Sequence, residues 1–464
     1  MRNKFQQMSL FDIYQNVEER LAQEKPELFK LLDEHLHWDE IIPQSFHQSF
    51  YKHYGRKRKY DLESFMRALL LQRLFHYVED SQLLNTLRHS QEMRQYCGFV
   101  KVPDSSKLTR FKQDFCDHIR TVFEYLVGLT EPICFEMDKA LANMLIYDTT
   151  GIESYVAENN PKFPRTKFGN FTEFSCVAAS NPAVKKQYIN GHFCFAQKAG
   201  VVTNGLGIVR HLELFDEDFK RRHPEMQIDK RTKHPEVDKE IGDSTSLKPI
   251  LSDFFTTHPT FKYKIFSADA AFDSYDNYTF LMNDCKFIKV VIPFNSRRGL
   301  PASDVGFNEN GTPLCPADST PFKPCGSSNG SDRRSPRLKF ICPKSKNVKM
   351  SNGKYTKRCM CDNPCTSSKY GRSVYVPLNK NFRLYPGISR DDEKFAKIYK
   401  NRTTAERSIN TLKDTLGLAN RKTSNVLTTK ADLFLAGIVQ LLCVLLAHKL
   451  HDRKLARRPR KLIA

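Results

Sequence analysis

The stretch M-L-I-Y-D at 144–148 joins four apolar or aromatic residues to an aspartate, and the residue pattern of the sequence changes at this point. Further apolar runs follow it, with helical patterns near 244–256 and 274–284 between some of them; the runs are 192–197, 208–215, 263–269 and 287–293. Short apolar runs alternating with helical segments are typical of an α/β fold. We therefore predict an α/β domain that begins near residue 140.

Two of the predicted strands end in an aspartate, Asp148 after M-L-I-Y and Asp269 after K-I-F-S-A. Side chains at the carboxyl ends of strands line the functional crevice of open α/β sheets. An aspartate after a strand is also a common turn or capping residue, which is the structural alternative. Asp273 and Asp276 are rival candidates for the second position, and Asp269 ranks first because it lies directly at the end of its strand.

A third carboxylate lies in Y-K-N-R-T-T-A-E-R-S-I-N-T-L-K-D, residues 399–414. At about 100° per residue, one sixth of the helix circumference would carry four polar side chains: Tyr399, Arg402, Glu406 and Lys413. An apolar flank about 90° away can dock on a core; it contains Ile398, Ala405, Ile409, Leu412 and Leu416. A solvated helix face with i,i+4 ion pairs is the alternative interpretation.

Three carboxylates brought together repel one another unless a cation neutralises them. Hard oxygen ligands of this kind suit Mg²⁺ or Mn²⁺. Two such ions could activate a water or a 3′-hydroxyl and stabilise the leaving oxygen of a phosphodiester. We therefore expect Asp148, Asp269 and Glu406 to bind metal. Tyr399, Arg402 and Lys413 are expected to bind DNA phosphates beside them.

The composition favours a polyanionic partner, because Lys and Arg exceed Asp and Glu by 73 to 52, giving a net charge of +21 and a pI near 9.3. Nucleic acid is the partner that such a charge favours, and a basic protein without one is the alternative. The longest apolar run, 433–447, has 15 residues with Gln440 among them, so it predicts a buried helix and not a membrane span. Thirteen cysteines and a start, M-R-N-K-F-Q-Q-M, without an apolar segment predict reduced thiols in a cytoplasm-like compartment.

Residues 1–135 read as helical, with Asp61 and Ser81 as expected caps and a third helix beginning at Ser105 or Ser106. That third helix presents basic side chains, Lys107, Arg110 and Lys112, and the run R-K-R-K lies at 56–59. Short helices with a basic last member suit a helix-turn-helix module that binds DNA. A plain helical bundle with solvated lysines is the alternative.

Residues 296–380 break the α/β pattern and are rich in Pro, Gly, Ser and Cys. Six cysteines gather there: Cys315, Cys325, Cys342, Cys359, Cys361 and Cys365. Zinc is a natural staple for a segment with little apolar content. The segment lacks a paired C-x2-C, so unligated reduced thiols are the alternative.

The spacing of Tyr399, Arg402, Glu406 and Lys413 resembles the Tyr-x2-Arg-x3-Glu-x6-Lys signature of bacterial insertion-sequence DDE transposases. The likeness extends over about 50–450. I-Y-D-T-T-G resembles the strand that carries the first Asp in that family, and S-A-D-A-A-F-D-S resembles the strand that carries the second Asp. G-R-K-R-K-Y-D-L-E-S-F-M-R-A-L-L-L-Q to V-P-D-S-S-K-L-T-R-F is similar to the N-terminal helical domain of that family. The sole tryptophan, Trp38, lies in the helical region, so an aromatic wedge for a hairpin intermediate is not expected.

The resemblance implies an α/β protein with an RNase H-like catalytic core, a Cys-rich insertion and an all-helical N-terminal DNA-binding region. The expected domains are 1–135 helical, 140–295 the first part of the core, 296–380 the insertion, and 381–464 the second part of the core with a basic helical C-terminus. The implied activity is Mg²⁺-dependent cleavage at transposon ends followed by strand transfer, by a homodimer on double-stranded DNA in the bacterial cytoplasm at the nucleoid. A metal nuclease without strand transfer and a domesticated DNA-binding protein are the alternatives.

Overall fold

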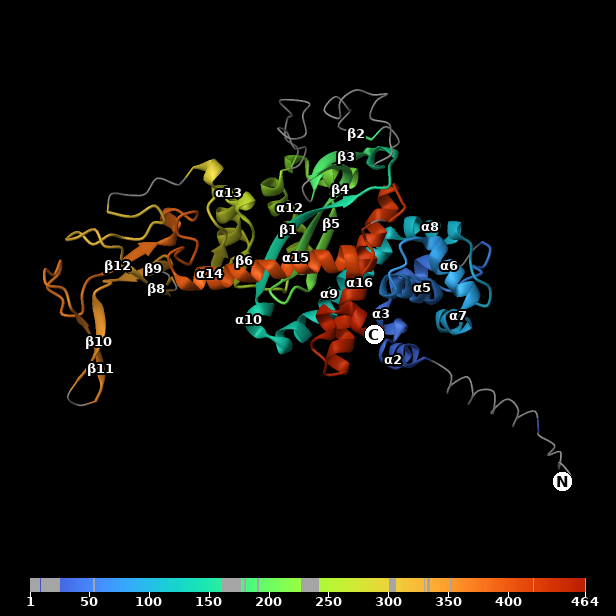
Figure 1. Ribbon diagram of the computed structural model, residues 1–464, viewed down its shortest axis with the longest axis horizontal. Helices are drawn as coiled ribbons and strands as arrows, with labels where there is room; N and C mark the ends of the chain where they lie inside the picture. Colours follow the sequence, from blue (N-terminus) through green and yellow to red (C-terminus); the bar gives the residue numbers. More distant parts are fainter. Residues whose placement is uncertain are drawn as a thin grey trace. The chain divides into compact units, whose positions relative to one another are not determined.

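The structure is a computed structural model (Figure 1). It describes residue 9 and residues 26–52, 55–160, 177–178, 181–189, 192–226, 242–299, 306–328, 330–331, 334–350, 353–419 and 421–463. The chain divides into two compact units. The helical unit comprises Met1–Thr130 with Thr411–Ala464, and the mixed unit comprises Glu131–Asn410. This division differs from the predicted domains, because residues 411–464 group with the N-terminal helices and not with the α/β core.

The helical unit is built from short helices and one long C-terminal helix. They are α2 (Glu27–His35), α3 (Trp38–Ile41), α4 (Gln44–Phe50), α5 (Leu62–Leu74), α6 (Asp80–His89), α7 (Gln91–Cys97), α8 (Ser105–Asp114), most of α9 (Cys116–Met137), and α16 (Val426–Lys449). The predicted start after Asp61 is confirmed, and α8 begins at Ser105 with Asp104 accepting a hydrogen bond from the Lys107 backbone N–H. Helix α6 starts two residues earlier than the predicted cap Ser81 implies, because Glu79 is the cap and forms a capping box with Gln82.

Helix α16 forms the centre of the helical unit, where it packs against α5 and α8. It is long and apolar enough to cross a membrane by length and composition, but 89% of its most apolar window is buried inside the protein. A core helix that is hydrophobic on all sides has this character. The prediction that 433–447 forms a buried helix is therefore confirmed.

A buried ion network joins the two sequence segments of the helical unit. Asp432 in α16 pairs with Arg73 and, at 2.9 Å, with Arg421. The Lys112 ammonium lies 2.9 Å from Asp80 and 3.2 Å from Asp432. Burial alone would raise the pKa of the Asp80 carboxyl, but Lys112 and Arg421 hold that pKa well below its usual range. Removing one member of such a network leaves an uncompensated buried charge, which costs about 3 to 5 kcal/mol.

The mixed unit is organised around one sheet whose order is β2-β3-β4-β1-β6-β7, with β5 also pairing with β4. The strands are β1 (Met144–Glu153), β2 (Val177–Ala178), β3 (Asn181–Ile189), β4 (His192–Asn204), β5 (Val209–Leu214), β6 (Ile265–Ser267) and β7 (Lys289–Val291). Strand β4 runs antiparallel to β1, β3 and β5, whereas β6 is parallel to β1 and to β7. The strands predicted from the apolar runs are all present, and the mixed α/β class is confirmed.

Helices cover both faces of the sheet in the mixed unit. Alternate residues Leu145 and Tyr147 of β1 share a core cluster with α12 (Asp243–Thr257) and α13 (Tyr275–Thr279). On the other face, Met144 and Ile146 pack against Ala405 of α15 (Thr403–Asn410). Alternation along a strand thus separates an α12 face from an α15 face. Short helices α10 (Lys139–Ala142) and α11 (Glu217–Arg222) lie in the connections.

The predicted insertion lies between β7 and α14 (Glu393–Tyr399), and it contains more regular structure than its composition suggests. A three-stranded sheet has the order β12-β9-β8, and β10 and β11 form a separate hairpin. Their bounds are β8 (Lys323–Ser328), β9 (Arg337–Ile341), β10 (Ser345–Lys349), β11 (Tyr355–Cys359) and β12 (Ser373–Pro377). Figure 1 shows the hairpin extending away from the three-stranded sheet.

Candidate functional site

Strand register brings the two predicted aspartates together. In the parallel β1–β6 pair, Met144 lies opposite Ile265 and Ile146 lies opposite Ser267. Continuing that register by two residues places Asp148 beside Asp269. Both positions fall on the face of Met144 and Ile146, because side chains of a strand alternate with a period of two. The aspartates therefore lie on the sheet face that α15 covers.

Glu406 comes from that covering helix. Ala405, its neighbour, is fully buried against Met144 and Ile146, and this contact fixes α15 over β1. The helical run is less regular than predicted, because the 3₁₀ turn η8 (Lys400–Arg402) separates α14 from α15 and the π-helix η9 (Thr411–Thr415) follows. With 3.0 residues per turn, a 3₁₀ turn alters the alignment that a uniform 100° per residue gives.

Burial and neighbouring charges both shift the pKa values of the two aspartates. Burial raises the pKa of the Asp148 carboxyl to about 6, and the neighbouring Asp269 and Glu406 carboxylates contribute to the increase. Burial also raises the pKa of Asp269, with Glu406 adding to it, whereas the hydrogen bond from the Ala271 backbone N–H lowers it. Such clustering of like charges is unfavourable without a cation. The three residues predicted from sequence therefore share one electrostatic site.

Arg402 supplies a positive charge at this site. Its Nη2 donates a hydrogen bond of 2.6 Å to Glu406 Oε1, and its Nη1 lies 3.6 Å from Asp148 Oδ2. Arg402 also lowers the pKa of both aspartates. Its guanidinium therefore bridges two carboxylates of the site, in addition to any role in binding phosphate.

A fourth carboxylate, that of Asp243, lies at the site and was not predicted from the sequence. Asp243 begins α12, and its Oδ1 accepts a hydrogen bond of 2.7 Å from Thr149 Oγ1 and lies 2.5 Å from the Lys198 ammonium. Its charge contributes to the raised pKa of Asp269. The register of β4 against β1, in which Lys198 lies opposite Gly151, and the packing of α12 against β1 bring these residues to the triad. The sequence carries no local motif that would have identified them.

The rival second aspartates have other environments. Asp273 is fully buried, and its two carboxylate oxygens accept hydrogen bonds from Arg383 at 3.0 and 2.7 Å. Its Oδ2 also accepts one of 2.8 Å from the Asn295 backbone N–H. Asp276 is exposed in the first turn of α13. Asp273 is therefore a structural ion-pair partner, and Asp269 is the better candidate.

The remaining predicted contact residues differ in exposure. Tyr399 is half-buried, and the Arg402 guanidinium lies 5.8 Å from the centre of its ring. Lys413 lies in η9, in the helical unit. Lys107 and Arg110 are exposed on α8, as predicted. Lys112 differs from the prediction, because it is fully buried and neutralises Asp80 and Asp432, so it cannot present its ammonium to DNA in this fold.

The donors at the triad fit a hard divalent cation chemically, since they are carboxylate oxygens. Among the described residues, however, no three His, Cys, Asp or Glu side chains stand at the spacing of ligands to one ion. At the triad, Arg402 contacts both Asp148 and Glu406. Rotation of the exposed Glu406 side chain away from Arg402 is needed before the three carboxylates can share an ion.

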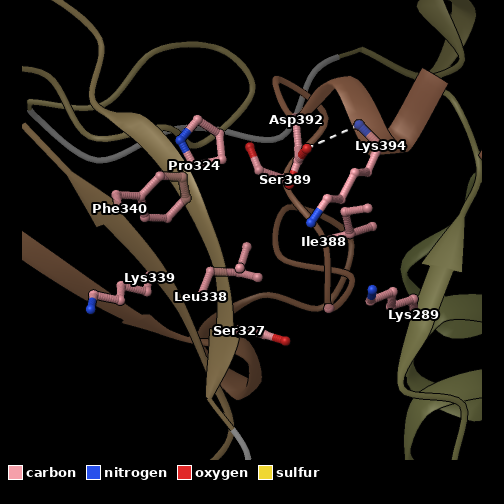
Figure 2. Close-up of a pocket in the computed structure, with 12 residues that line it drawn as sticks. Lys289, Pro324, Ser327, Leu338, Lys339, Phe340, Ile388, Ser389, Asp392 and Lys394 are labelled. Carbon is pink, nitrogen blue, oxygen red and sulfur yellow. Dashed lines mark hydrogen bonds between the residues drawn. The ribbon is translucent and has the colours of Figure 1, made fainter. Parts of the chain in front are cut away.

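A separate pocket lies at the insertion and does not include the triad. Its volume is about 40 Å³, and Figure 2 shows Leu338 and Phe340 of β9 on one side and the Ile388 to Lys394 segment on the other. Asp392 there accepts a hydrogen bond of 2.9 Å from the Lys394 backbone N–H, as the cap of α14. The space holds little more than a water molecule, so we assign no ligand to it.

Comparisons with known proteins bear on the helical region. A family described as "Transposase domain (DUF772)" matches residues 16–114. A search of curated proteins finds no match. Among solved structures, the piggyBac transposase synaptic complex with hairpin DNA is similar with 12% identity and a TM-score of 0.37, over 94% of this chain and 78% of that chain. A likeness this low does not establish a shared fold, so the family match stands as the informative result.

Proposed function

We propose that this protein is a DNA transposase that cleaves the ends of its own mobile element and joins them to target DNA. The main support is the convergence of Asp148, Asp269 and Glu406 on one face of the mixed sheet. The net charge of +21 suits a DNA partner. The match of residues 16–114 to a transposase domain family points to the same process.

An RNase H-like core is part of this proposal. In the central sheet, β5, β4 and β1 are antiparallel neighbours, and β6 and β7 continue the sheet parallel to β1. The first Asp lies on the central β1, the second follows the adjacent β6, and the Glu lies on a helix after β7. This arrangement supports the RNase H-like assignment that the sequence resemblance implies, with 296–380 as an insertion before the Glu helix.

The three carboxylates would hold two Mg²⁺ or Mn²⁺ ions, which would activate a water or a 3′-hydroxyl and stabilise the leaving oxygen. Asp148 and Asp269 are fixed by the sheet, and Glu406 is fixed through the buried neighbour Ala405. Once its hydrogen bond to Glu406 is broken, Arg402 can donate two parallel hydrogen bonds to a DNA phosphate. Tyr399 and Lys413 would contact phosphates on either side, and Lys107 and Arg110 on α8 would contact DNA at the element ends.

The proposal is tested with the full chain and duplexes that carry the sequences flanking its coding region. Asp269→Ala should abolish Mg²⁺-dependent cleavage while leaving DNA binding intact. The matched control is Asp276→Ala, which removes an equal charge from an exposed position on the next helix. Normal cleavage by Asp269→Ala would contradict the site assignment.

The same assay separates the alternatives. A domesticated DNA-binding protein would bind the duplex but never cut it in Mg²⁺ or Mn²⁺. A metal nuclease would cut it without joining the free 3′-hydroxyl to a target plasmid. The proposed transposase does both, and because two ends must be held together, it should form a homodimer on DNA. Its expected location is the bacterial cytoplasm, at the nucleoid.

A further inference from the structure

Four of the six cysteines in the insertion gather at the base of the β10–β11 hairpin. Cys342 and Cys315 are buried in the insertion core, and Cys359 and Cys365 pack against the same cluster. Cys342 lies just before β10, and Cys359 ends β11 opposite Ser345. None of the described cysteines forms a disulfide bond. Cysteines from positions 315 to 365 of the chain are thus collected at one point of the fold.

The thiols approach one another in two pairs. Cys359 adds to the raised pKa of Cys342, and Cys315 adds to the raised pKa of Cys365. The two pairs also lie near each other, because charge on the Cys342 thiolate adds to the raised pKa of Cys365. Burial raises the pKa of the Cys342 and Cys365 thiols, and the adjacent thiols raise both further.

The backbone is held tightly around these thiols. The backbone N–H of Cys342 donates to Arg372 O, and that of Cys359 donates to Lys369 O, both at 2.9 Å. Between these two acceptors lies Gly371, with φ of +83°. A Cβ at Gly371 would lie 3.0 Å from the Cβ of Cys342 and 3.6 Å from that of Cys359. The returning chain therefore passes directly over both cysteines.

The insertion has little else to stabilise this region. A two-stranded hairpin alone is marginally stable in water, and β10 and β11 pair only with each other in the part of the chain that the structure describes. The insertion core is formed mostly by the three-stranded sheet and its connections, and among the described residues Cys359 is the one hairpin-strand residue that packs against it. The hairpin thus depends on its base, where the cysteines lie.

We propose that one Zn²⁺ ion binds at the base of the β10–β11 hairpin through four thiolates, those of Cys315, Cys342, Cys359 and Cys365. Tetrahedral Cys₄ coordination is a common form of structural zinc site. Zn–S bonds of about 2.3 Å require sulfur atoms roughly 3.8 Å apart. Side-chain rotation that brings the two pairs together completes the site, since the described thiols do not yet stand at ligand spacing.

Two cysteines are excluded from the ligand set. Cys361 donates from its Sγ to Asn363 O at 3.3 Å, within its own turn, and lies outside the core cluster. Cys325 lies in β8, also outside that cluster. Two cations lie near the thiols. Asp318 raises the pKa of Lys344, with Cys361 and Cys315 adding to the increase, and the charge of Arg372 acts to lower the pKa of Cys365. These two cations would offset the charge of a tetrathiolate site.

The test begins with the full wild-type chain, purified without chelator in the presence of Zn²⁺. Metal analysis should find one zinc per chain. After exchange into Co²⁺, the thiolate-to-metal absorption band should have the intensity of four Co–S bonds. Absence of both zinc and the cobalt band would overturn the proposal, and an intensity for fewer than four bonds would overturn the ligand set.

Single Cys→Ser variants then identify the ligands. Cys342→Ser and Cys365→Ser should lose the stoichiometric zinc, whereas the matched controls Cys361→Ser and Cys325→Ser should retain it. Retention of zinc by Cys342→Ser, or its loss from Cys361→Ser, would overturn the assignment. The cobalt spectrum of the wild-type chain does not depend on the folding of any variant, so the proposal stays testable if Cys342→Ser is insoluble.

Chelation provides the structural readout. Removing zinc from the wild-type chain should expose the segment 342–372 to limited proteolysis without affecting the helical unit. Unchanged cleavage in this segment after zinc loss would contradict a stabilising role. This proposal is independent of DNA cleavage, so a failure of the transposase proposal leaves its outcome unchanged.

Discussion

Arg402 donates a 2.6 Å hydrogen bond to Glu406, one helical turn further along the chain, and its second amino group lies 3.6 Å from Asp148. The guanidinium therefore stands where it neutralises carboxylates that a divalent cation would otherwise neutralise. A cation entering the triad and Arg402 compete for the same oxygen atoms. Metal binding and release of Arg402 toward DNA phosphate are consequently coupled in the proposed mechanism.

Arg402→Gln should increase the affinity of the DNA-free protein for Mn²⁺. The variant removes the competing cation, while its amide can still accept and donate hydrogen bonds. We expect a several-fold lower Kd in isothermal titration, and a loss of about 10- to 150-fold in cleavage of bound DNA, since a charged hydrogen bond contributes about 1.5 to 3 kcal/mol.

Lys397→Gln is the matched control for that experiment. It removes the same charge from an exposed position of α14. An equal increase in Mn²⁺ affinity in this control would mean that net charge alone is responsible. Unaltered affinity in Arg402→Gln would show that the guanidinium does not compete with the ion.

Asp148→Asn should stabilise the metal-free protein at pH 8. The folded-state pKa of Asp148 is raised from 3.8 to about 6, so the folded protein keeps a proton that the unfolded chain loses near pH 4. Stability therefore falls as the pH rises from about 4 to about 6, and the full penalty persists above that. A shift of this size corresponds to about 3 kcal/mol, which is an upper bound on the gain.

The measurement is thermal unfolding in EDTA at pH 4.5 and pH 8. Asp148→Asn should melt at a higher temperature than the wild type at pH 8, and the difference should be much smaller at pH 4.5. The exposed Asp276→Asn should show neither effect. A variant that melts below the wild type at pH 8 would refute the raised pKa.

Substitutions of Lys112 and Arg110, which lie on the same helix, should affect different properties: the first stability, the second DNA binding. Lys112→Met should lower the free energy of unfolding by about 3 to 5 kcal/mol, because it leaves Asp80 and Asp432 without one of their buried counter-ions. Arg110→Ala should leave stability within about 0.5 kcal/mol and reduce the salt dependence of DNA binding by about one unit. Denaturant unfolding and a salt series of binding isotherms provide the two measurements. Equal stability of the two variants would contradict the buried network.

The segment 1–135 should not fold by itself. Arg73 and Lys112 would lose Asp432, and α5 and α8 would lose their packing against α16. A fusion of 1–130 to 411–464 through a flexible linker should restore cooperative thermal unfolding. The opposite result, a cooperative transition in 1–135 alone, would show that α16 is dispensable.

The sequence predicted the strands and the three carboxylates because each rests on a local pattern. Apolar runs identify β1 and β6, and the aspartates are adjacent to those runs. Asp243 and Lys198 could not be predicted, since helix packing and strand pairing over long sequence separations bring them to the site. Lys112 was misread for a related reason. A lysine on an amphipathic helix looks exposed until the buried Asp432, which lies far along the chain, is known as its partner.

The shared helical unit also determines when the protein can become active during synthesis. Ribosomes release a chain from its N-terminus, and domains usually fold in that order. Here the N-terminal helices need α16, so their core is incomplete until nearly the whole chain has emerged. The mixed unit is continuous in sequence and can fold before them. Under the proposed function, a truncated translation product would carry the candidate catalytic carboxylates without a completed helical unit, so incomplete chains would lack the part proposed to bind the element ends.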